Sequence, residues 1–160
     1  QLVLGDALAV CLLKLKGFSS NDFAKFHPAG ILGKKLTLKV KDIYNPLSKP
    51  SVELNDGFDK IILEISSKRL GATVVVGRGD IKGVITDGDI RRFLENKSDI
   101  YKCVALDLMS EKPKLIDENE LAYFALSLMK KNNITQLVVT KNNLYTGIIH
   151  LHDLLKEKIN

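Results

Sequence analysis

A seven-residue phrase that occurs twice constrains this chain more than any other feature. Residues 83–89 read Gly-Val-Ile-Thr-Asp-Gly-Asp, and residues 147–153, 64 positions later, read Gly-Ile-Ile-His-Leu-His-Asp. Each copy follows an apolar run and a short polar turn, and each leads into a helical pattern. Two copies of one supersecondary unit predict a fold built by internal duplication.

Both copies predict the same order of elements. The first opens at residues 40–44, continues with apolar residues at helical spacing over 57–68, and then has β-branched runs at 73–76 and 81–85 around a glycine-containing turn. The second copy repeats the opening segment, the helical pattern and the hairpin turn at residues 105–109, 121–129 and 141–143. With the helix after each phrase, the predicted unit is β-α-β-β-α, present twice.

Residues 1–36 lie outside the repeat. Residues 2–16 predict a helix that is apolar on nearly every side, and such a helix requires burial against other protein surface. Gly17 ends this helix, and residues 19–22 supply capping groups for a short second helix that Pro28 stops. Because the sequence begins inside an apolar helical pattern, we expect it to be a piece of a longer protein.

Composition limits the class of partner. Of the 160 residues 45% are hydrophobic, and the net charge of +5 comes from lysines scattered along the chain, which disfavours nucleic acid but suits a small anionic ligand. No apolar run approaches the ~20 residues that span a bilayer. Cys11 and Cys103 lie in apolar contexts without metal-ligand spacing. We therefore expect buried, reduced thiols in a cytoplasmic protein that has no metal or other cofactor.

The element order, together with the Gly-apolar-apolar-Thr-x-x-Asp phrase, resembles the CBS domain. The resemblance covers residues 38–160 and implies a tandem CBS pair, whose two sheets pack face to face around a pseudo-twofold axis. The expected fold class is α+β, with CBS repeats at residues 37–99 and 100–160 behind a helical leader at residues 1–36.

The first phrase supplies candidate ligand-binding residues: Thr86, Asp87, Gly88, Asp89, Arg91 and Arg92. A hydroxyl and free N–H groups where a strand meets a helix can bind phosphate, and Asp89 can accept hydrogen bonds from a ribose diol. Gly88 lets a ligand approach the backbone, and the two arginines can add charge-assisted hydrogen bonds. Alternatively, Thr86 caps the helix and Asp89 is a favourable first-turn charge.

The second phrase departs from the first and supplies His150, His152 and Asp153 as candidate ligand-binding residues. Two histidines at this spacing can share a metal, but no cysteine or carboxylate cluster completes the site, so no metal is expected. An imidazole that hydrogen-bonds a carboxylate, phosphate or base is the preferred interpretation, and a protonated ring also favours an anion. Histidines that only pack are the alternative.

The leader contains further phrases, Gly-Asp-Ala-Leu-Ala-Val at residues 5–10 and His-Pro-Ala-Gly-Ile-Leu-Gly at residues 27–33. These resemble the end of the sugar isomerase (SIS) domain in arabinose 5-phosphate isomerases, and residues 86–92 and 150–155 are similar to that family's two CBS phrases. The resemblance implies that residues 1–36 are the C-terminal remnant of an α/β SIS domain. The parent enzyme would interconvert ribulose 5-phosphate and arabinose 5-phosphate for synthesis of 3-deoxy-D-manno-octulosonate (Kdo), a sugar of lipopolysaccharide.

The same resemblance implies a catalytic role for His27 in proton transfer at a subunit boundary, although Ala29 stands where the family usually has glycine. The other residues of that active site would lie upstream. This chain alone is therefore expected to be inactive.

Two classes of function follow from these resemblances. In the first, the CBS pair regulates the isomerase by binding a nucleotide or nucleotide sugar, with the activated end product CMP-Kdo as the expected feedback ligand and adenine nucleotides as the alternative. In the second, the pair is a structural clamp that builds the oligomer without a ligand. The expected partners are the chain's own SIS domain and further copies of the chain, as a dimer here and a tetramer in the longer protein.

Overall fold

The computed structural model describes residues 2–19, 22, 26, 30–95 and 99–159. Its strands are β1 (Ser51–Glu53), β2 (Ala72–Gly77), β3 (Asp80–Thr86), β4 (Ser110–Glu111), β5 (Leu115–Asp117), β6 (Gln136–Lys141) and β7 (Leu144–His150). Its helices are α1 (Leu2–Leu15), α3 (Ile31–Thr37), α4 (Phe58–Lys68), α5 (Asp87–Glu95), α6 (Ala105–Leu108), α7 (Ala122–Asn132) and α8 (Leu151–Lys156), with 3-10 turns η1 (Val40–Asp42) and η2 (Ile100–Lys102).

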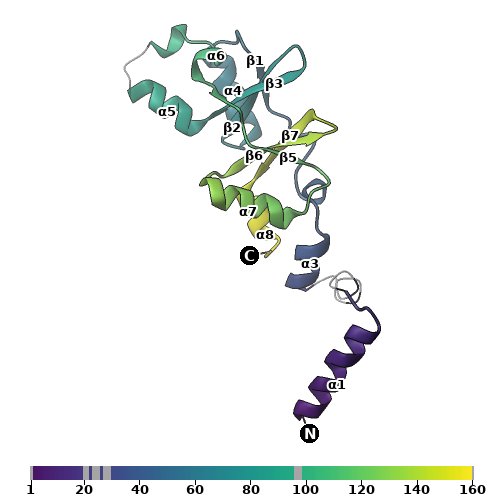
Figure 1. Cartoon of the computed structure of the whole chain (residues 1–160). Coiled ribbons are helices and arrows are strands. Elements are labelled where there is room, and N and C mark those ends of the chain that lie inside the picture. Colours follow the sequence, from purple (N-terminus) through teal and green to yellow (C-terminus); the bar gives the residue numbers. More distant parts are fainter. Residues whose placement is uncertain (1, 20–21, 23–25, 27–29, 96–98, 160) are drawn as a thin grey trace.

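The chain forms two small mixed sheets, one for each repeat, and the first also includes β4 from the second repeat (Figure 1). The strand orders are β1-β2-β3-β4 and β5-β6-β7, and in both sheets a parallel pair is followed by an antiparallel hairpin. Ala72 pairs with Thr86 in the first hairpin as Gln136 pairs with His150 in the second, and both hairpins shift register at the equivalent point. The predicted α+β fold with a duplicated β-α-β-β-α unit is confirmed.

A cluster of buried side chains joins the two sheets: Ala72, Val74, Val138, Tyr145 and Ile148. The Tyr145 hydroxyl donates a hydrogen bond to the carbonyl of Pro50, 2.7 Å away, so the hairpin of one repeat is also tied to the loop before β1 of the other. Since the apolar side chains of both sheets face each other across this cluster, the ends of the two hairpins lie close together.

The opening segment of each repeat is not the strand that the sequence predicted. Residues 40–44 contain the 3-10 turn η1 and residues 105–109 contain α6, whereas the first strands are β1 and β5. The reason is that the other repeat satisfies the backbone of these segments. The N–H groups of Val40 and Lys41 donate to the carbonyls of Glu120 and Glu118, and the N–H of Ala105 donates to the carbonyl of Asp56.

The side chains of the opening segments are exchanged between repeats in the same way. Val40 and Tyr44 are buried in the core of the second repeat, with Leu126 and Ile149 among their partners. Ile100, Cys103, Ala105 and Leu108 are buried in the core of the first, with Val52, Ile61 and Ile85. Neither repeat therefore completes its core from its own β-α-β-β-α unit.

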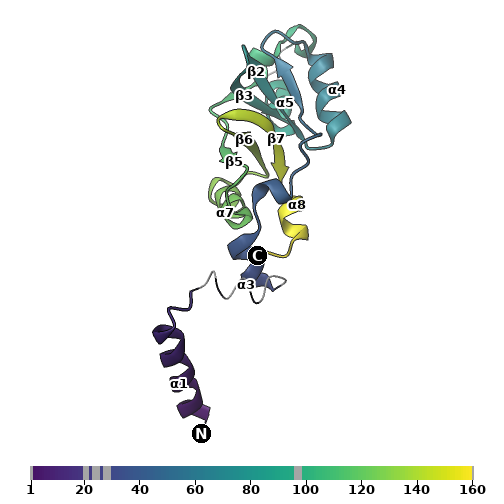
Figure 2. The same cartoon turned by 90° about the vertical axis from the view of Figure 1, so that its right-hand side faces the viewer.

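The helix α1 projects away from the two sheets (Figure 2). Its large apolar side chains are exposed: Leu2, Val3, Leu4, Leu8, Val10, Leu12, Leu13 and Leu15. The prediction of two buried thiols is right for Cys103 and wrong for Cys11, because no residue of α1 is buried by the rest of the described chain. The short helix predicted before Pro28 falls largely outside the described residues.

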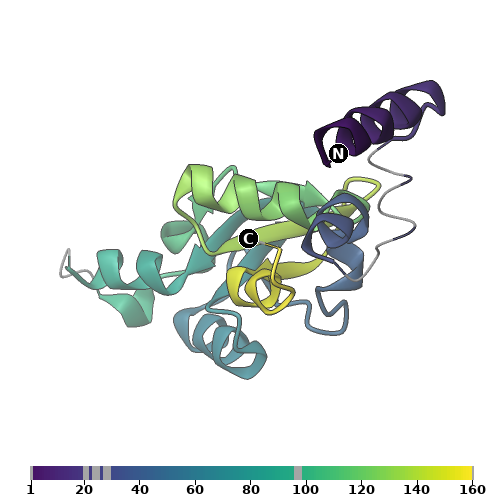
Figure 3. The same cartoon turned by 90° about the horizontal axis from the view of Figure 1, so that it is seen from below.

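The helix α3 holds the leader against the second repeat, next to α7 and α8 (Figure 3). The Lys34 ammonium lies 2.8 Å from a carboxylate oxygen of Glu157 and also donates to the Glu157 carbonyl. Just after α3, the carbonyl of Leu38 accepts a hydrogen bond from the N–H of Ala122 at the start of α7. The chain therefore enters the pair through its second repeat.

The glycine that opens each repeated phrase permits a close contact across the fold. A Cβ at Gly83 would lie 2.7 Å from the sulfur of Met109 and 2.9 Å from the carbonyl oxygen of Ser110, and one at Gly147 would lie 3.0 Å from the Tyr44 ring. Gly83→Ala is expected to lower the free energy of unfolding by about 1–3 kcal/mol, because β4 has to move away from β3. Urea unfolding measures this loss.

Gly5→Ala is the control, since a Cβ there meets nothing within 4 Å. No loss of stability is expected for it, because alanine is favoured over glycine inside a helix such as α1 by about 0.5–1 kcal/mol. Equal stabilities of the two variants would contradict the steric argument.

Candidate functional site

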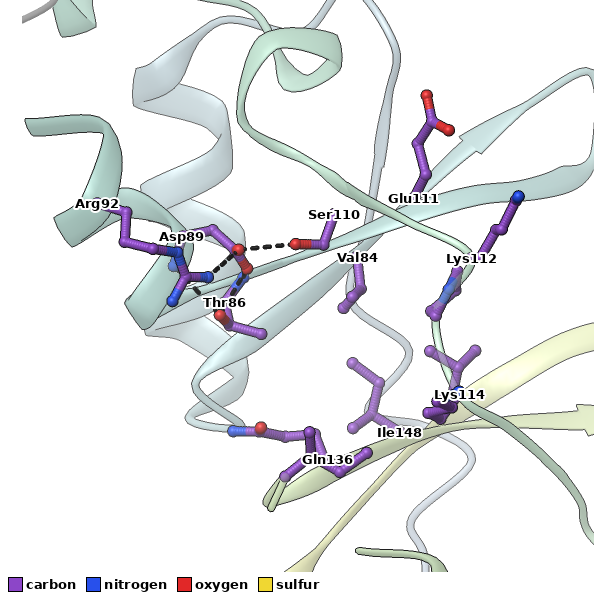
Figure 4. A pocket seen from close by; sticks show the side chains of 13 residues that line it. Val84, Thr86, Asp89, Arg92, Ser110, Glu111, Lys112, Lys114, Gln136 and Ile148 are labelled. Atoms are coloured by element: carbon purple, nitrogen blue, oxygen red, sulfur yellow. Dashed lines mark hydrogen bonds and ion pairs between the residues drawn. The ribbon is translucent and has the colours of Figure 1, made fainter. Parts of the chain in front are cut away.

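Two clefts lie where the hairpins end. Cleft 1 is a cavity of about 240 Å³ at the junction of β3 and α5 (Figure 4). Its lining residues are Val84, Thr86, Asp89, Arg92, Ser110, Glu111, Lys112, Pro113, Lys114, Ile134, Gln136, Val138 and Ile148. The side chains of Val84, Ile134, Val138 and Ile148 give it an apolar floor, while Arg92, Lys112 and Lys114 give it a basic rim.

Cleft 2 lies at the equivalent junction of β7 and α8 and is wider, about 600 Å³. Its lining residues are Ile65, Ser66, Arg69, Leu70, Gly71, Asp87, Gln136, His150, His152, Asp153 and Lys156. Polar and charged side chains dominate this cleft, in contrast to the apolar floor of cleft 1. Gln136 lines both clefts.

The structure divides the predicted site residues between the clefts. Thr86, Asp89 and Arg92 line cleft 1, whereas Asp87, His150, His152 and Asp153 line cleft 2. A Cβ at Gly88 would make ordinary contacts with Arg92 and Thr86, 3.4 and 3.5 Å away. Arg91 is exposed and lines neither cleft, and His27 lies outside the described residues.

Asp89 is the organising group of cleft 1. Its Oδ2 accepts hydrogen bonds from the N–H of Thr86 at 2.8 Å and from the Thr86 hydroxyl at 2.6 Å. Its Oδ1 accepts from the Ser110 hydroxyl at 2.8 Å and pairs with the guanidinium of Arg92. The helix-cap role considered for Thr86 and Asp89 is therefore present, and Figure 4 shows how these side chains converge.

The hydrogen bonds to Asp89 determine its charge. Burial of this carboxyl, which is 8% exposed, would raise its pKa, but the bonds from Thr86, Ser110 and Arg92 outweigh burial and lower it. Asp89 is consequently ionised at neutral pH. The carboxylate is held in one position before any ligand arrives.

The histidine pair of cleft 2 has different chemistry. The Nδ1 atom of His150 accepts a hydrogen bond from the N–H of His152 at 3.1 Å, so His150 takes the position that Thr86 has in the first repeat, at the helix N-terminus. Burial, together with the neighbouring His152 ring, lowers the pKa of His150. A protonated His150 ring, which would also favour an anion, is therefore disfavoured, and the neutral ring presents Nε2–H as a donor.

The remaining charged groups of cleft 2 mirror those of cleft 1. The ammonium of Lys156 lies 3.0 Å from a carboxylate oxygen of Asp153, as Arg92 pairs with Asp89. Arg69 ends α4 in a left-handed conformation, with φ of 56°. Cleft 2 thus combines two cations and two imidazoles with the carboxylates of Asp87 and Asp153.

The polar lining residues that escaped the sequence predictions include Arg69, Ser110, Lys112, Lys114, Gln136 and Lys156. Ser110, Lys112 and Lys114 reach cleft 1 because the opening segment of the second repeat packs on the first, and no local pattern signals that exchange. Gln136, by contrast, could have been recognised from the sequence. It is a polar residue at the start of an apolar strand, where the first repeat has Ala72.

Metal binding and membrane insertion have no matching feature among the described residues. Within the described ranges, no three histidine, cysteine or acidic side chains converge closely enough to hold a metal ion. No helix among these residues has the length and apolar character needed to cross a bilayer.

Solved structures with the same fold include bound nucleotides. A CBS domain protein from Pyrobaculum aerophilum, complexed with AMP, superposes with a TM-score of 0.65 at 18% identity, covering 77% of this chain and 100% of that one. A conserved protein from Pyrococcus horikoshii gives a TM-score of 0.68 at 18% identity, covering 78% and 94% of the two chains. At these identities the likeness establishes the fold alone.

The curated sequence relatives belong to the isomerase family that the sequence resembled. Arabinose 5-phosphate isomerases of Francisella tularensis and Yersinia pestis are 45% and 41% identical, each over 97% of this chain and 48% of its own length. The chain therefore spans about half the length of these curated relatives, and the resemblance to this isomerase family is confirmed. The profile of the CBS domain matches residues 40–96 and again residues 104–160. With two matched copies and the corresponding fold, the chain belongs to the CBS domain family.

Proposed function

We propose that this chain is the regulatory CBS pair of an arabinose 5-phosphate isomerase and that it binds a nucleotide or nucleotide sugar. The observation that carries the proposal is cleft 1, where an apolar floor adjoins an ionised Asp89 and three basic side chains. In this proposal residues 1–36 belong to the SIS domain of a cytoplasmic enzyme. Catalysis, including the role of His27, requires residues upstream, so the chain alone is inactive.

The chemistry of cleft 1 suits the parts of a nucleotide. A base packs on Val84, Val138 and Ile148, and a ribose hydroxyl can donate to Oδ1 of Asp89 in place of the Ser110 hydroxyl. A phosphate near Thr86 meets the N-terminus of α5 and the cations of the rim. CMP-Kdo joins these parts to an acidic sugar and is the activated product of the pathway that the isomerase supplies, so we propose it as the feedback ligand. AMP or ATP is the alternative, as in structural neighbours described with AMP.

A thermal-shift experiment with CMP-Kdo, CMP, AMP, ATP and arabinose 5-phosphate tests this proposal. A ligand that binds the folded chain alone adds about 2.7 kcal/mol of stability at a hundredfold excess over Kd. We expect CMP-Kdo to raise the melting temperature most. Lys114→Gln, on the rim of cleft 1, should reduce the shift, whereas Lys131→Gln, at an exposed position of α7 outside both clefts, should leave it unchanged.

A structural clamp is the second candidate, and two observations favour it. The apolar side chains of α1 are exposed, and the hydrogen bonds of Asp89 are already made within the chain. A flat thermal response to all five compounds, together with a dimer in sedimentation, would support the clamp. A strictly monomeric species at high concentration would contradict the proposed dimer and the tetramer of the parent.

A further inference from the structure

Clefts 1 and 2 adjoin each other at Gln136 and have complementary chemistry. Cleft 1 has an apolar floor, whereas cleft 2 is lined by Arg69, His150, His152 and Lys156. Thr86, at the end of β3, lines the first cleft, and its neighbour Asp87 lines the second. The two clefts are therefore neighbours, and a ligand longer than cleft 1 would extend over Thr86 and Gln136 towards cleft 2.

The volumes indicate that cleft 1 holds only part of a large ligand. Its 240 Å³ lies below the range of about 300–1,000 Å³ that is usual for small-molecule sites, whereas cleft 2 offers about 600 Å³. A nucleoside is flat and partly apolar, as is the floor of cleft 1. A charged, hydroxylated sugar suits the open and polar cleft 2.

We infer that one ligand spans both clefts, with its nucleoside in cleft 1 and an acidic sugar, joined through a phosphodiester, in cleft 2. The sugar carboxylate faces Arg69 and Lys156, and the Nε2–H of His150 donates to the sugar or to the linking phosphate. This inference rests on the proposed nucleotide-sugar function and assigns the second half of the ligand to residues of its own.

The boundary between the clefts is formed by Gln136 and Gly71. The Gln136 amide is fixed because its Nε2 donates to the carbonyl of Leu70 at 3.2 Å and its Oε1 accepts from the Thr135 hydroxyl at 2.8 Å. A Cβ at Gly71 would lie 3.2 Å from this Nε2 and 3.3 Å from Oδ2 of Asp87. Gly71 has φ of +63°, so glycine suits the backbone there and also lets the side chains of Gln136 and Asp87 approach it closely.

The charges of cleft 2 favour a ligand whose second half carries a carboxylate over one whose second half is neutral. Arg69 offers a planar donor pair that matches a carboxylate, and Lys156 adds a second cation. Asp153 already pairs with Lys156, which leaves Asp87 as the carboxylate of cleft 2 that faces Arg69. A ligand whose second half carries a cation would lose the contact with Arg69 and could pair in this cleft only with Asp87.

Isothermal titration of the whole chain with CMP, CMP-Kdo and CDP-choline tests the inference. CDP-choline attaches a cation to the same nucleoside. We expect CMP-Kdo to bind roughly tenfold or more tightly than CMP, and CDP-choline to bind no more tightly than CMP. In the double variant Arg69→Gln, Lys156→Gln the ratio of the two affinities should fall to within about threefold of one, with the affinity for CMP preserved.

Lys158→Gln is the matched control, because Lys158 is exposed, has the same φ of 56° as Arg69 and lies outside the lining of cleft 2. It should keep the preference for CMP-Kdo. If CMP binds but CMP-Kdo binds equally, or if the double variant keeps the full preference, the spanning ligand is overturned while nucleotide binding stands. If no compound binds at millimolar concentration, both the inference and the proposed function are overturned.

Discussion

Residues 37–99, produced as a separate chain, are expected to be unfolded in water, and so are residues 100–160. The first piece loses Ile100, Cys103, Ala105 and Leu108 from its core, and the second loses Val40 and Tyr44. A unit of ~60 residues buries little surface even when its core is complete. Removing a buried aromatic or aliphatic side chain costs about 2–5 kcal/mol, so the loss of several exceeds the stability of a small domain.

Circular dichroism and amide NMR spectra of the two pieces measure this outcome. Residues 30–160, which keep α3 and both repeats but lack α1, are the control and should unfold in one cooperative transition. A cooperative thermal transition in either isolated piece would show that a repeat is self-sufficient and that the exchanged segments are dispensable.

Asp89→Ala is expected to lower the free energy of unfolding by about 2–3 kcal/mol at pH 7. The substitution removes a helix cap and leaves the hydroxyls of Thr86 and Ser110 without the acceptor that they share. The control is Asp153→Ala, at the same position of the second repeat. Asp153 pairs with Lys156 near the surface, and a loss of about 0–1 kcal/mol is expected there. Equal losses would contradict the organising role of Asp89.

The stability attributed to Asp89 should depend on pH in one direction. Its pKa is lowered in the folded chain, so the unfolded chain takes up the proton first as pH falls. The contribution is complete above the unfolded pKa of about 3.9 and disappears as pH falls through the folded value. The difference in unfolding free energy between the original chain and Asp89→Ala should therefore be constant from pH 7 to about 5 and shrink in stronger acid.

The hairpins and the helices beside them were predictable from sequence because their signals are local. The runs 73–76 and 81–85 and the turn between them became β2 and β3, each extended by one residue at either end, and the pattern over 57–68 became α4. The openings were not predictable, since residues 40–44 and 105–109 take the structure that the opposite repeat imposes. The same distinction applies to cleft 1. Thr86 and Asp89 were predictable because they belong to a local motif, whereas Ser110 and Lys112 were not, because they come from a distant part of the chain.

The position of α3 determines how a movement in the CBS pair is transmitted to the leader. Lys34 and Leu38 fasten the incoming chain to Glu157 and Ala122, and the chain then runs through the interior of the second repeat before β1 begins. Among the described residues, α3 therefore joins the leader to the second repeat, and the first repeat is joined to α3 through the second. A movement that starts at Thr86 therefore reaches the leader only through the second repeat. A movement that starts at His150 begins at the N-cap residue of α8, a helix that is followed directly by Glu157, the partner of Lys34 in α3.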